Sequence, residues 1–369
     1  MVRARPVRRV LAAVLLLPAA VSGAMDPAPE AHTAGAGSYT WRLPRGFPLP
    51  AVPADNPMSE AKVALGRRLF FEPRLSVSGR YSCASCHEPS RSFSDGRTRA
   101  VGATGERLPH NALALVNVAY NVSFGWSEPQ VRSLEMQMRK PMLSRHPIEL
   151  GLAGREARLC AALSADPRYA AAFATAFPRE GGVQQGLAGA VTFDHLVKAI
   201  AAFERTLISG DSPFDRYVFG GEHGALSEEA KHGMALFFSP QVGCAQCHSG
   251  FNFAGNWRDA QGVTGGPSFA NDGTSAHPLR VPTLRNIALT APYMHDGRFA
   301  TLARVLEHYS ALGQPARTRG HGHRDPRLPQ HPLDAGERTA LIAFLESLTD
   351  ESYGQRYATG GSAPQVAGQ

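Results

Sequence analysis

Two short stretches of the chain place sulfur and imidazole side chains at the same spacing. In each, two cysteines are separated by two residues, and a histidine follows the second cysteine. The residues are Cys83, Cys86 and His87 in the first stretch, and Cys244, Cys247 and His248 in the second. Cysteine thiolates bind metals, attack electrophiles and pair as disulfides, so the spacing must decide which chemistry these side chains serve.

The separation of the two pairs argues against a zinc ribbon, in which the pairs usually lie about 15–20 residues apart. Here about 160 residues separate Cys83 from Cys244. A thioredoxin-like redox site needs one such pair near a βαβ pattern, which we do not find. A cysteine pair followed at once by histidine is the signature of covalent c-type haem attachment, in which the histidine binds the iron. The sequence therefore predicts two covalently bound c-type haems.

One further cysteine and one further histidine are predicted to have structural roles. Cys160 lies in the alanine-rich stretch "REARLCAAL", and we expect a buried free thiol there. His195 lies at the start of a stretch with helical periodicity, and we expect it on the helix surface or at the helix cap rather than on a metal.

The first residues predict export. Four arginines within the first nine residues precede a short apolar stretch at 10–21, and small residues at 22–24 offer a cleavage site after Ala24. The apolar stretch is too short to span a bilayer, and no later segment reaches about 18 uninterrupted apolar residues. We therefore predict a signal peptide at 1–24 and a periplasmic mature protein without a membrane anchor.

The basic charge of the chain largely belongs to this leader. The formal net charge is +7, and four of the arginines lie in residues 1–24, which contain no acidic residue. No run of lysines and arginines remains in the rest of the chain, so nucleic acid is not an expected partner.

The elements that carry the two haem motifs are duplicated. The stretch "GRRLFFEP" at 66–73 precedes the first motif, and "GMALFFSP" at 233–240 precedes the second. Both have the pattern of a short helix that ends at a proline. Each half of the chain therefore resembles one small helical cytochrome unit, with a helix, a turn, the haem motif and covering loops.

The rest of the chain favours helices, and we predict a mainly α protein with two cytochrome c-like haem domains and long loops. We expect helices near 155–163, 169–177, 193–207, 301–310 and 334–348, and we find no convincing alternating strand pattern. The predicted divisions are a signal peptide at 1–24, an arm or linker at 25–55, an N-terminal haem domain at 56–212, a C-terminal haem domain at 213–352 and a disordered tail at 353–369.

The predicted helix near 301–310 contains a tyrosine that could reach a haem. Thr301 can cap the helix, and Leu302, Leu306 and Tyr309 share its apolar stripe, whereas Glu307 and His308 are predicted to point away. A tyrosine on such a stripe is either a core ring or a ligand, and the spacing alone leaves both interpretations open.

The motifs together resemble the bacterial di-haem cytochrome c peroxidase superfamily. The likeness covers roughly residues 55–350 and includes "TLRNIALTAPYMHDGRFATL" at 283–302. Family members carry a methionine ligand of the C-terminal haem twelve residues after the glycine of the "HDG" segment, and here that position is Tyr309. Tyrosine at this position is similar to the MauG-like branch, and "DGRTRAVGATGERLPHNALALVNVAYN" at 95–121 resembles its MbnH-type enzymes.

The resemblance implies a reaction. An anionic oxygen ligand favours ferric and higher oxidation states, whereas methionine favours ferrous iron. The resemblance therefore implies that hydrogen peroxide meets the His87 haem, that a high-valent di-haem state forms, and that the haem held by His248 and Tyr309 stores one oxidising equivalent. Tryptophan side chains of an exported partner protein would supply the electrons.

The resemblance also names the residues of the peroxide pocket. The family lines this pocket with a glutamine, a proline and a glutamate, which match Gln137, Pro141 and Glu149. The spacing from proline to glutamate is about two residues longer than in the family, and His146 is a neighbouring alternative to Glu149. An acid or base at this position would move protons during cleavage of the O–O bond.

Two further features follow from the same likeness. Trp126 matches the family tryptophan that lies between the haems and relays electrons. The implied inter-domain calcium ion would bind the side chain of Asn117 and the backbone carbonyls of Arg280 and Pro282, because oxygen ligands suit this hard cation.

One departure and two rival functions stay open. The MauG enzyme has a surface tryptophan shortly before its second haem motif, where this chain has Val242, and Trp257 is a nearby substitute. The rivals are a peroxidase that removes hydrogen peroxide with electrons from a small cytochrome c or cupredoxin, and a non-enzymatic di-haem electron carrier. Met142 and Met294 lie near plausible ligand positions, so both rivals remain possible.

Overall fold

The fold is described from a computed structural model of the chain. The structure describes residues 32–33, 39–178, 189–312, 325, 327–328 and 332–358. The predicted signal peptide lies outside this part of the chain. Within the described residues, no helix is long and apolar enough to cross a membrane.

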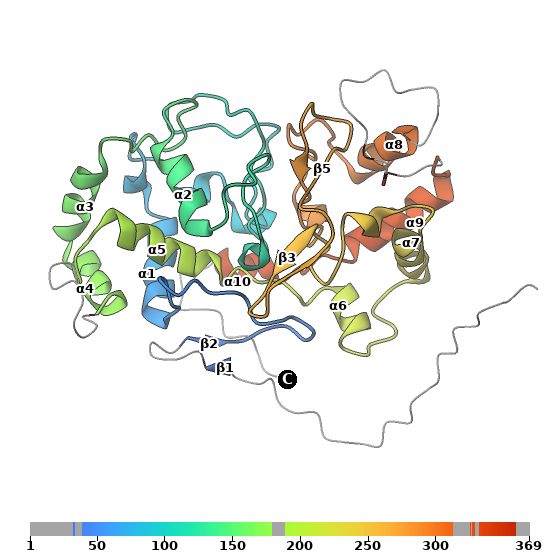
Figure 1. The fold of residues 1–369 in the computed structure, drawn as a ribbon, viewed down its shortest axis with the longest axis horizontal. Helices are drawn as coiled ribbons and strands as arrows, with labels where there is room; N and C mark the ends of the chain where they lie inside the picture. The colour runs from blue at the N-terminus through green and yellow to red at the C-terminus, as the bar shows by residue number, and fades with distance from the viewer. Residues whose placement is uncertain are drawn as a thin grey trace, which may run out of the picture. The chain divides into compact units, whose positions relative to one another are not determined.

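The described chain is mainly helical, as the sequence predicts (Figure 1). Its helices are α1 Glu60–Phe70, α2 Leu134–Leu143, α3 Glu156–Ser164, α4 Pro167–Ala176, α5 Phe193–Glu204, α6 Pro213–Val218, α7 Glu228–Phe238, α8 Leu302–Leu312, α9 Ala335–Glu346 and α10 Tyr353–Ala358. Helices α1, α3, α4, α5, α7, α8 and α9 were expected from the sequence, whereas α2, α6 and α10 were not.

The strands are short and occur as three separate antiparallel pairs. The pairs are β1 His32–Thr33 with β2 Thr40–Trp41, β3 Asn256–Arg258 with β4 Val263–Gly265, and β5 Phe269–Ala270 with β6 Leu279–Arg280. No described strand joins a larger sheet. The long loops are therefore positioned by the helices and haem motifs on which they pack.

The two duplicated helices each cross a second helix at a glycine. Helix α1 meets α5 at Gly66, where an added Cβ would overlap the carbonyl oxygen of Ala199 and lie 3.0 Å from the Cβ of Phe203. Helix α7 meets α9 at Gly233, where a Cβ would overlap the carbonyl oxygen of Ala340. The same close crossing therefore occurs in both halves, and α7 lies beside α9 in Figure 1.

The repeat extends beyond these helices to a pair of asparagines. Asn117 and Asn286 have φ values of 56° and 58°, and each precedes a single 3₁₀ turn, at Val118–Tyr120 and Ile287–Leu289. The left-handed conformation is one that asparagine tolerates better than most residues. The chain thus repeats both its helix crossing and the loop that follows each haem motif.

Two hydrophobic cores form around the crossings. The first includes Leu69, Phe70, Phe93, Leu196 and Phe203, and the second includes Phe237, Phe253, Leu306, Leu341 and Phe344. The cores agree with one apolar centre per half, and the predicted domain boundary at 212/213 stays a prediction.

The ends of the described chain are more ordered than the sequence suggested. The predicted disordered tail begins at residue 353, but residues 353–358 form α10, and Tyr353 and Tyr357 are buried in the first core. The prediction is wrong there because the tyrosines find their apolar partners on α5 and near Phe93, far away in sequence. Residues 359–369 lie outside the described residues.

The predicted arm is packed as well. The ring of Phe47 contacts that of Phe251 with a centroid separation of 4.7 Å, and the carbonyl of Pro48 accepts a 2.8 Å hydrogen bond from Tyr120 Oη. Leu49 offers its carbonyl to the backbone N–H of Ala260. The arm therefore touches residues of both halves.

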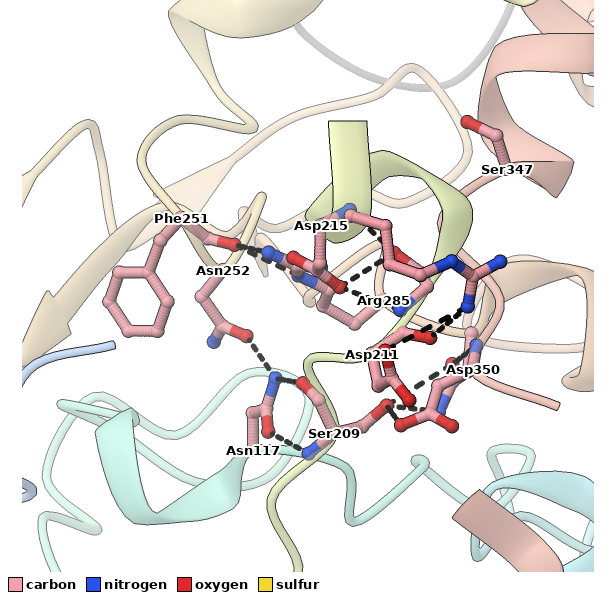
Figure 2. Close-up of polar contacts among 12 residues, drawn as sticks. Asn117, Ser209, Asp211, Asp215, Phe251, Asn252, Arg285, Ser347 and Asp350 are labelled. Atoms are coloured by element: carbon pink, nitrogen blue, oxygen red, sulfur yellow. Dashed lines mark hydrogen bonds and ion pairs between the residues drawn. The ribbon is translucent and has the colours of Figure 1, made fainter. Parts of the chain in front are cut away.

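A buried polar network clamps the segment that connects the halves (Figure 2). Arg285 is only 1% exposed and pairs with Asp215 at 2.6 Å. Asn117 accepts a 2.8 Å hydrogen bond from the N–H of Ser209, and the Ser209 hydroxyl donates to Asp350. Because buried charges and amides are costly unless they are paired, this network holds residues 209–215 in one conformation.

Candidate active site

The two haem motifs have the same local structure. Cys83 and Cys244 each open a single 3₁₀ turn, and the carbonyl of each accepts a hydrogen bond from the N–H of the motif histidine, at 3.0 Å and 2.9 Å. All five cysteines have free thiols in the structure. The two pairs are therefore not disulfides, and each presents two thiols and an imidazole from one turn.

Both motif histidines are oriented for a metal. The ring Nδ1 of His87 lies 2.8 Å from the carbonyl oxygen of Phe93, and Nδ1 of His248 lies 3.1 Å from that of Phe253. Both phenylalanines have positive φ, of 61° and 46°, a strained conformation in each half. With the Nδ1 proton donated to a carbonyl, Nε2 remains the free ligand atom.

The charge state of the two imidazoles agrees with this role. Burial lowers the pKa of both His87 and His248 below the ordinary value, so both rings are held neutral. A neutral imidazole with a carbonyl behind it is the form that binds iron. These observations fit c-type haem at both motifs.

Tyr309 lies beside the second motif. Its helix α8 is capped by Thr301, whose hydroxyl accepts a 3.2 Å hydrogen bond from the N–H of Arg304. Burial, together with the nearby Asp272 carboxylate and the sulfurs of Cys244 and Cys247, holds the pKa of the Tyr309 phenol well above its usual value. The phenol and the two thiols, all three partly buried, therefore lie near one another.

One detail of α8 differs from the sequence prediction. Glu307 is exposed and pairs with Arg304, as expected. His308 does not point into solvent: it is partly buried, its Nε2 lies 3.0 Å from the carbonyl oxygen of Asp272, and its ring packs against Phe299. The loop at 271–274 covers this side of the helix, which the helical periodicity could not reveal.

Helix α2 provides two of the predicted peroxide-pocket residues. Gln137 is partly buried, and its Oε1 atom is buried without a hydrogen-bond partner. Pro141 lies inside the helix and has no N–H to offer the turn before it. Met142, the residue after Pro141, is wholly buried in the first core. Met294 is partly buried and has a φ of 69°.

The structure brings Glu149 toward the first haem motif. Burial raises the pKa of the Glu149 carboxyl, an effect that the Lys140 ammonium opposes, and Glu149 in turn raises the pKa of Cys86. The alternative residue, His146, is exposed. Of the two candidates, only Glu149 is a partly buried acid near the Cys86 thiol.

Trp126 lies among residues of both halves. Its Nε1 atom donates a 3.1 Å hydrogen bond to the carbonyl of Asn111, and its backbone carbonyl accepts one from the N–H of Arg280. Its ring centroid is 6.3 Å from those of His110 and His295. This position between the halves fits the implied electron relay.

The predicted calcium ligands do not form a free set of oxygens. The side-chain oxygen of Asn117 accepts the N–H of Ser209, and the carbonyl of Pro282 lies 3.1 Å from Nδ1 of His248. The side-chain oxygen of the nearby Asn111 is buried without a hydrogen-bond partner, and its amide nitrogen donates to the carbonyl of Pro292 at 2.9 Å. The assignment of Asn117, Arg280 and Pro282 to a calcium ion stays a prediction, and the side chain of Asn117 also takes part in the polar network.

The residues considered for an electron exit lie in different surroundings. Val242 is buried in the second core. Trp257 is partly buried on β3 and lines an open cavity of about 610 Å³, together with Phe47, Phe238 and Phe251. Its indole nitrogen has no hydrogen-bond partner.

Cys160 and His195, the two residues that were predicted to have structural roles, both lie in helices. Cys160 is a partly buried free thiol on α3. His195 lies in the first turn of α5, with Nδ1 2.8 Å from the carbonyl oxygen of Ala190 and its ring stacked on Phe177 at 4.1 Å.

Comparison with known proteins agrees with these features. The profile of the di-haem cytochrome c peroxidase family matches residues 60–223. The chain is 37% identical over 318 residues to the methylamine utilization protein MauG of Methylorubrum extorquens, with 84% of each chain covered. It is 34% identical over 320 residues to the cytochrome c peroxidase Ccp of Escherichia coli, covering 82% of this chain and 61% of that protein.

Two solved structures are similar in fold. A MauG-like protein associated with microbial copper homeostasis is 36% identical, with a TM-score of 0.77 over 86% of this chain and 97% of that one. The diheme peroxidase BthA from Burkholderia thailandensis is 22% identical, with a TM-score of 0.62 over 90% and 99% of the two chains. At that identity, the second likeness shows the fold alone.

Proposed function

The chain belongs to the di-haem cytochrome c peroxidase family, and from this membership we propose that it oxidises tryptophan side chains of an exported partner protein with hydrogen peroxide. The family and its relatives are peroxidases, so the chain is a haem-dependent oxidoreductase. The identity of its electron donor is the part that we infer.

Membership implies two haems, and the residues present fit them. Cys83, Cys86 and His87 would hold one. Cys244, Cys247, His248 and Tyr309 would hold the other. When bound, the haems supply the electrons that reduce peroxide and accept replacements from the donor.

The observation that carries the proposal is the phenol of Tyr309 beside the second pair of thiols. A partly buried phenol with a strongly raised pKa loses its proton readily only where a cation replaces the proton, and ferric iron is such a cation. A phenolate ligand favours the more oxidised states of iron over the ferrous state. This half of the molecule is thus built to retain an oxidising equivalent, which a slow reaction with another protein requires.

The predicted peroxide pocket, with Gln137, Pro141 and Glu149, would supply the proton chemistry. Reduction of hydrogen peroxide to two waters consumes two electrons and two protons. The partly buried carboxyl of Glu149 can take a proton from one peroxide oxygen and return it to the other, and Gln137 offers an amide that can orient the peroxide. We assign Pro141 to the pocket wall and Trp126 to the electron path between the halves.

The inference of a protein substrate draws on the MauG-like relatives. That relative, 36% identical, is described as a MauG-like protein associated with microbial copper homeostasis. We infer that this chain acts on a partner protein in the periplasm, after removal of residues 1–24. The identity of the partner stays outside the proposal.

The experiment uses purified protein with both irons ferric and one equivalent of hydrogen peroxide. We expect the parent protein to react without added reductant, and a Tyr309→Met variant to need prior one-electron reduction. Tyr309→Phe should change the electron paramagnetic resonance spectrum of one haem. Tyr293→Phe is the control, because Tyr293 is a buried tyrosine of the second core, in the same half of the chain as Tyr309. If Tyr309→Phe and the parent protein give the same spectrum, the proposal is lost.

The principal alternative is a peroxidase that removes peroxide with electrons from a small cytochrome c or cupredoxin. The 34% identity to the Escherichia coli peroxidase, close to the 37% for MauG, favours it as a second candidate. An absolute need for reduction in the parent protein would select this alternative. Two unreactive low-spin ferric haems would select the electron carrier.

A further inference from the structure

The loop behind each motif histidine carries a buried polar residue next to its strained phenylalanine. These residues are Ser92, before Phe93, and Asn252, before Phe253, and both are 0% exposed. The carbonyls of the two phenylalanines face Nδ1 of the motif histidines. Since a buried polar side chain is costly unless it is hydrogen-bonded, the partners of Ser92 and Asn252 help to set the conformation of both loops.

These partners belong to the opposite half of the chain. The amide nitrogen of Asn286, which follows the second motif, donates a 3.1 Å hydrogen bond to the hydroxyl of Ser92, which follows the first. The amide nitrogen of Asn117, which follows the first motif, donates a 3.0 Å hydrogen bond to Oδ1 of Asn252, which follows the second (Figure 2). Asn117 and Asn286 are the two asparagines that the repeat places at positive φ. The two contacts therefore run crosswise, each from one half to the histidine loop of the other.

Ser209, in the segment that connects the halves, joins the two asparagines. Its N–H donates a 2.8 Å hydrogen bond to Oδ1 of Asn117, and its carbonyl accepts one of 3.1 Å from the Asn117 amide nitrogen. Its hydroxyl accepts a 3.1 Å hydrogen bond from the amide nitrogen of Asn286. Each amide nitrogen thus uses both of its hydrogens, one on Ser209 and one on the opposite loop. Neither asparagine side chain can turn without breaking one of these contacts.

The two loops differ in how much they depend on the crosswise contact. Asn252 is also held within its own half, where the hydroxyl of Thr283 donates a 2.5 Å hydrogen bond to its backbone carbonyl. For the hydroxyl of Ser92, the contact that the structure shows is the one with Asn286. Loss of the Asn286 side chain should therefore disturb the first loop more than loss of the Asn117 side chain disturbs the second.

We propose that Asn286 is a positioning residue for the haem at His87, in the opposite half of the chain. Asn117 has the same role for the haem at His248. Each asparagine acts through the loop carbonyl that accepts the Nδ1 proton of that histidine. A hydrogen bond from Nδ1 makes the imidazole a stronger electron donor to iron, which favours the ferric state. The inference rests on haem binding at the two motifs, but not on Tyr309 or on the identity of the electron donor.

The test compares Asn286→Gly with Asn117→Gly. The two variants are matched, because each removes the same buried side chain at a φ of 58° or 56°, which glycine adopts without strain. Spectroelectrochemical titration of the haem-loaded protein measures the reduction potential of each haem, and a His87→Met variant, which changes the ligand of one haem, assigns the two signals. Urea unfolding of each variant separates a general loss of stability from a change at one haem.

Asn286→Gly should raise the ratio of ferrous to ferric iron at the His87 haem about tenfold at a fixed potential, which is a shift of about 59 mV. The His248 haem should keep its potential in this variant. Asn117→Gly should raise the potential of the His248 haem, but by less, because Thr283 still holds that loop. Resonance Raman spectra of the ferrous protein should show the same selectivity, as a lower iron–histidine stretching frequency at the affected haem.

A purely structural role predicts that each substitution affects the haem of its own half. That pattern would overturn the inference, as would equal shifts of both haems or unchanged potentials. Ser92→Gly removes the other end of the contact with Asn286, at a φ of 54°. Combined with Asn286→Gly, it should add little to the shift at the His87 haem, because the contact is already lost, and additive shifts would contradict the inference. None of these results bears on whether Tyr309 binds iron.

Discussion

Replacement of Gly66 or Gly233 by alanine should destabilise the protein, although alanine is the better helix former. Alanine gains about 1 kcal/mol over glycine in a helix interior. At both positions, however, the new Cβ would overlap a backbone carbonyl oxygen of the facing helix, Ala199 on α5 or Ala340 on α9. A carbonyl oxygen cannot rotate away as a side chain can, so the whole helix must shift.

Overpacking of this kind costs about 1–3 kcal/mol, and a backbone neighbour places these sites at the upper end. The expected net loss is about 2 kcal/mol of unfolding free energy for each variant. Gly336→Ala is the matched control. Gly336 lies in α9, and the nearest atom to an added Cβ is the Asp334 carboxylate oxygen at 3.4 Å. There the helix preference acts without a clash, and we expect a gain of up to about 1 kcal/mol.

Urea unfolding of the haem-loaded proteins, followed by far-ultraviolet circular dichroism, measures all three variants. Because α7 leads directly into the second haem motif, Gly233→Ala should also shift the Soret band, whereas Gly336→Ala should not. Should Gly66→Ala and Gly233→Ala prove as stable as the parent, the close crossings described here are not what sets the position of the haem motifs.

Three further outcomes are expected. Arg285→Met should lower the free energy of unfolding in urea by about 3–5 kcal/mol, because it leaves Asp215 buried without its cation. Arg304→Met breaks an exposed pair with Glu307 and should change this free energy by less than about 1 kcal/mol. Equal effects would contradict the role given to the buried polar network in Figure 2. Burial raises the pKa of Glu204 to about 8, so between about pH 4.5 and pH 8 the folded state binds a proton that the unfolded state has lost, and the unfolding free energy should fall as the pH rises. Glu204→Gln should flatten this part of the curve of unfolding free energy against pH, and an unchanged slope would refute the assignment. Trp126→Phe should leave consumption of the first peroxide equivalent intact but slow oxidation of the partner protein at least about tenfold in stopped-flow measurements, and Trp257→Phe compares the second indole; a Trp126→Phe variant with the parent's rate would remove Trp126 from the electron path.

The features that could be predicted from the sequence are those whose information is local. A cysteine pair followed by histidine specifies its own turn, and the glycine in "GRRLFFEP" and "GMALFFSP" marks a helix crossing twice in one chain. The apolar stripe of the helix at 301–310 places Tyr309 on its inner face, whereas its assignment as a haem ligand follows from the family resemblance and stays a prediction. In each case, neighbouring residues determine the geometry.

The features that were missed depend on distant partners. In the sequence, Tyr353 and Tyr357 belong to a segment that looks like a polar tail. In the structure, Tyr353 packs against Phe93 and Tyr357 against Phe203. Asn117 and Asn111 lie in the same loop, and their sequence does not show that the Asn117 oxygen accepts from Ser209 or that the Asn111 amide nitrogen donates to Pro292. Spacing along the sequence cannot predict such contacts, because they join segments about 90 to 260 residues apart.

The duplication fits our proposal that one fold holds two haems with different duties. Everything behind the two histidines is alike: a glycine crossing, a strained phenylalanine and its carbonyl on Nδ1. The halves differ in what faces the opposite side. In the second half, α8 brings the Tyr309 phenol toward the thiols, whereas in the first half a loop brings Glu149 and α2 brings Gln137, side chains suited to peroxide rather than to iron. Replacing an iron ligand by side chains suited to peroxide therefore needs new residues only on the loops and helices opposite the motif histidine. The haem attachment itself can stay the same.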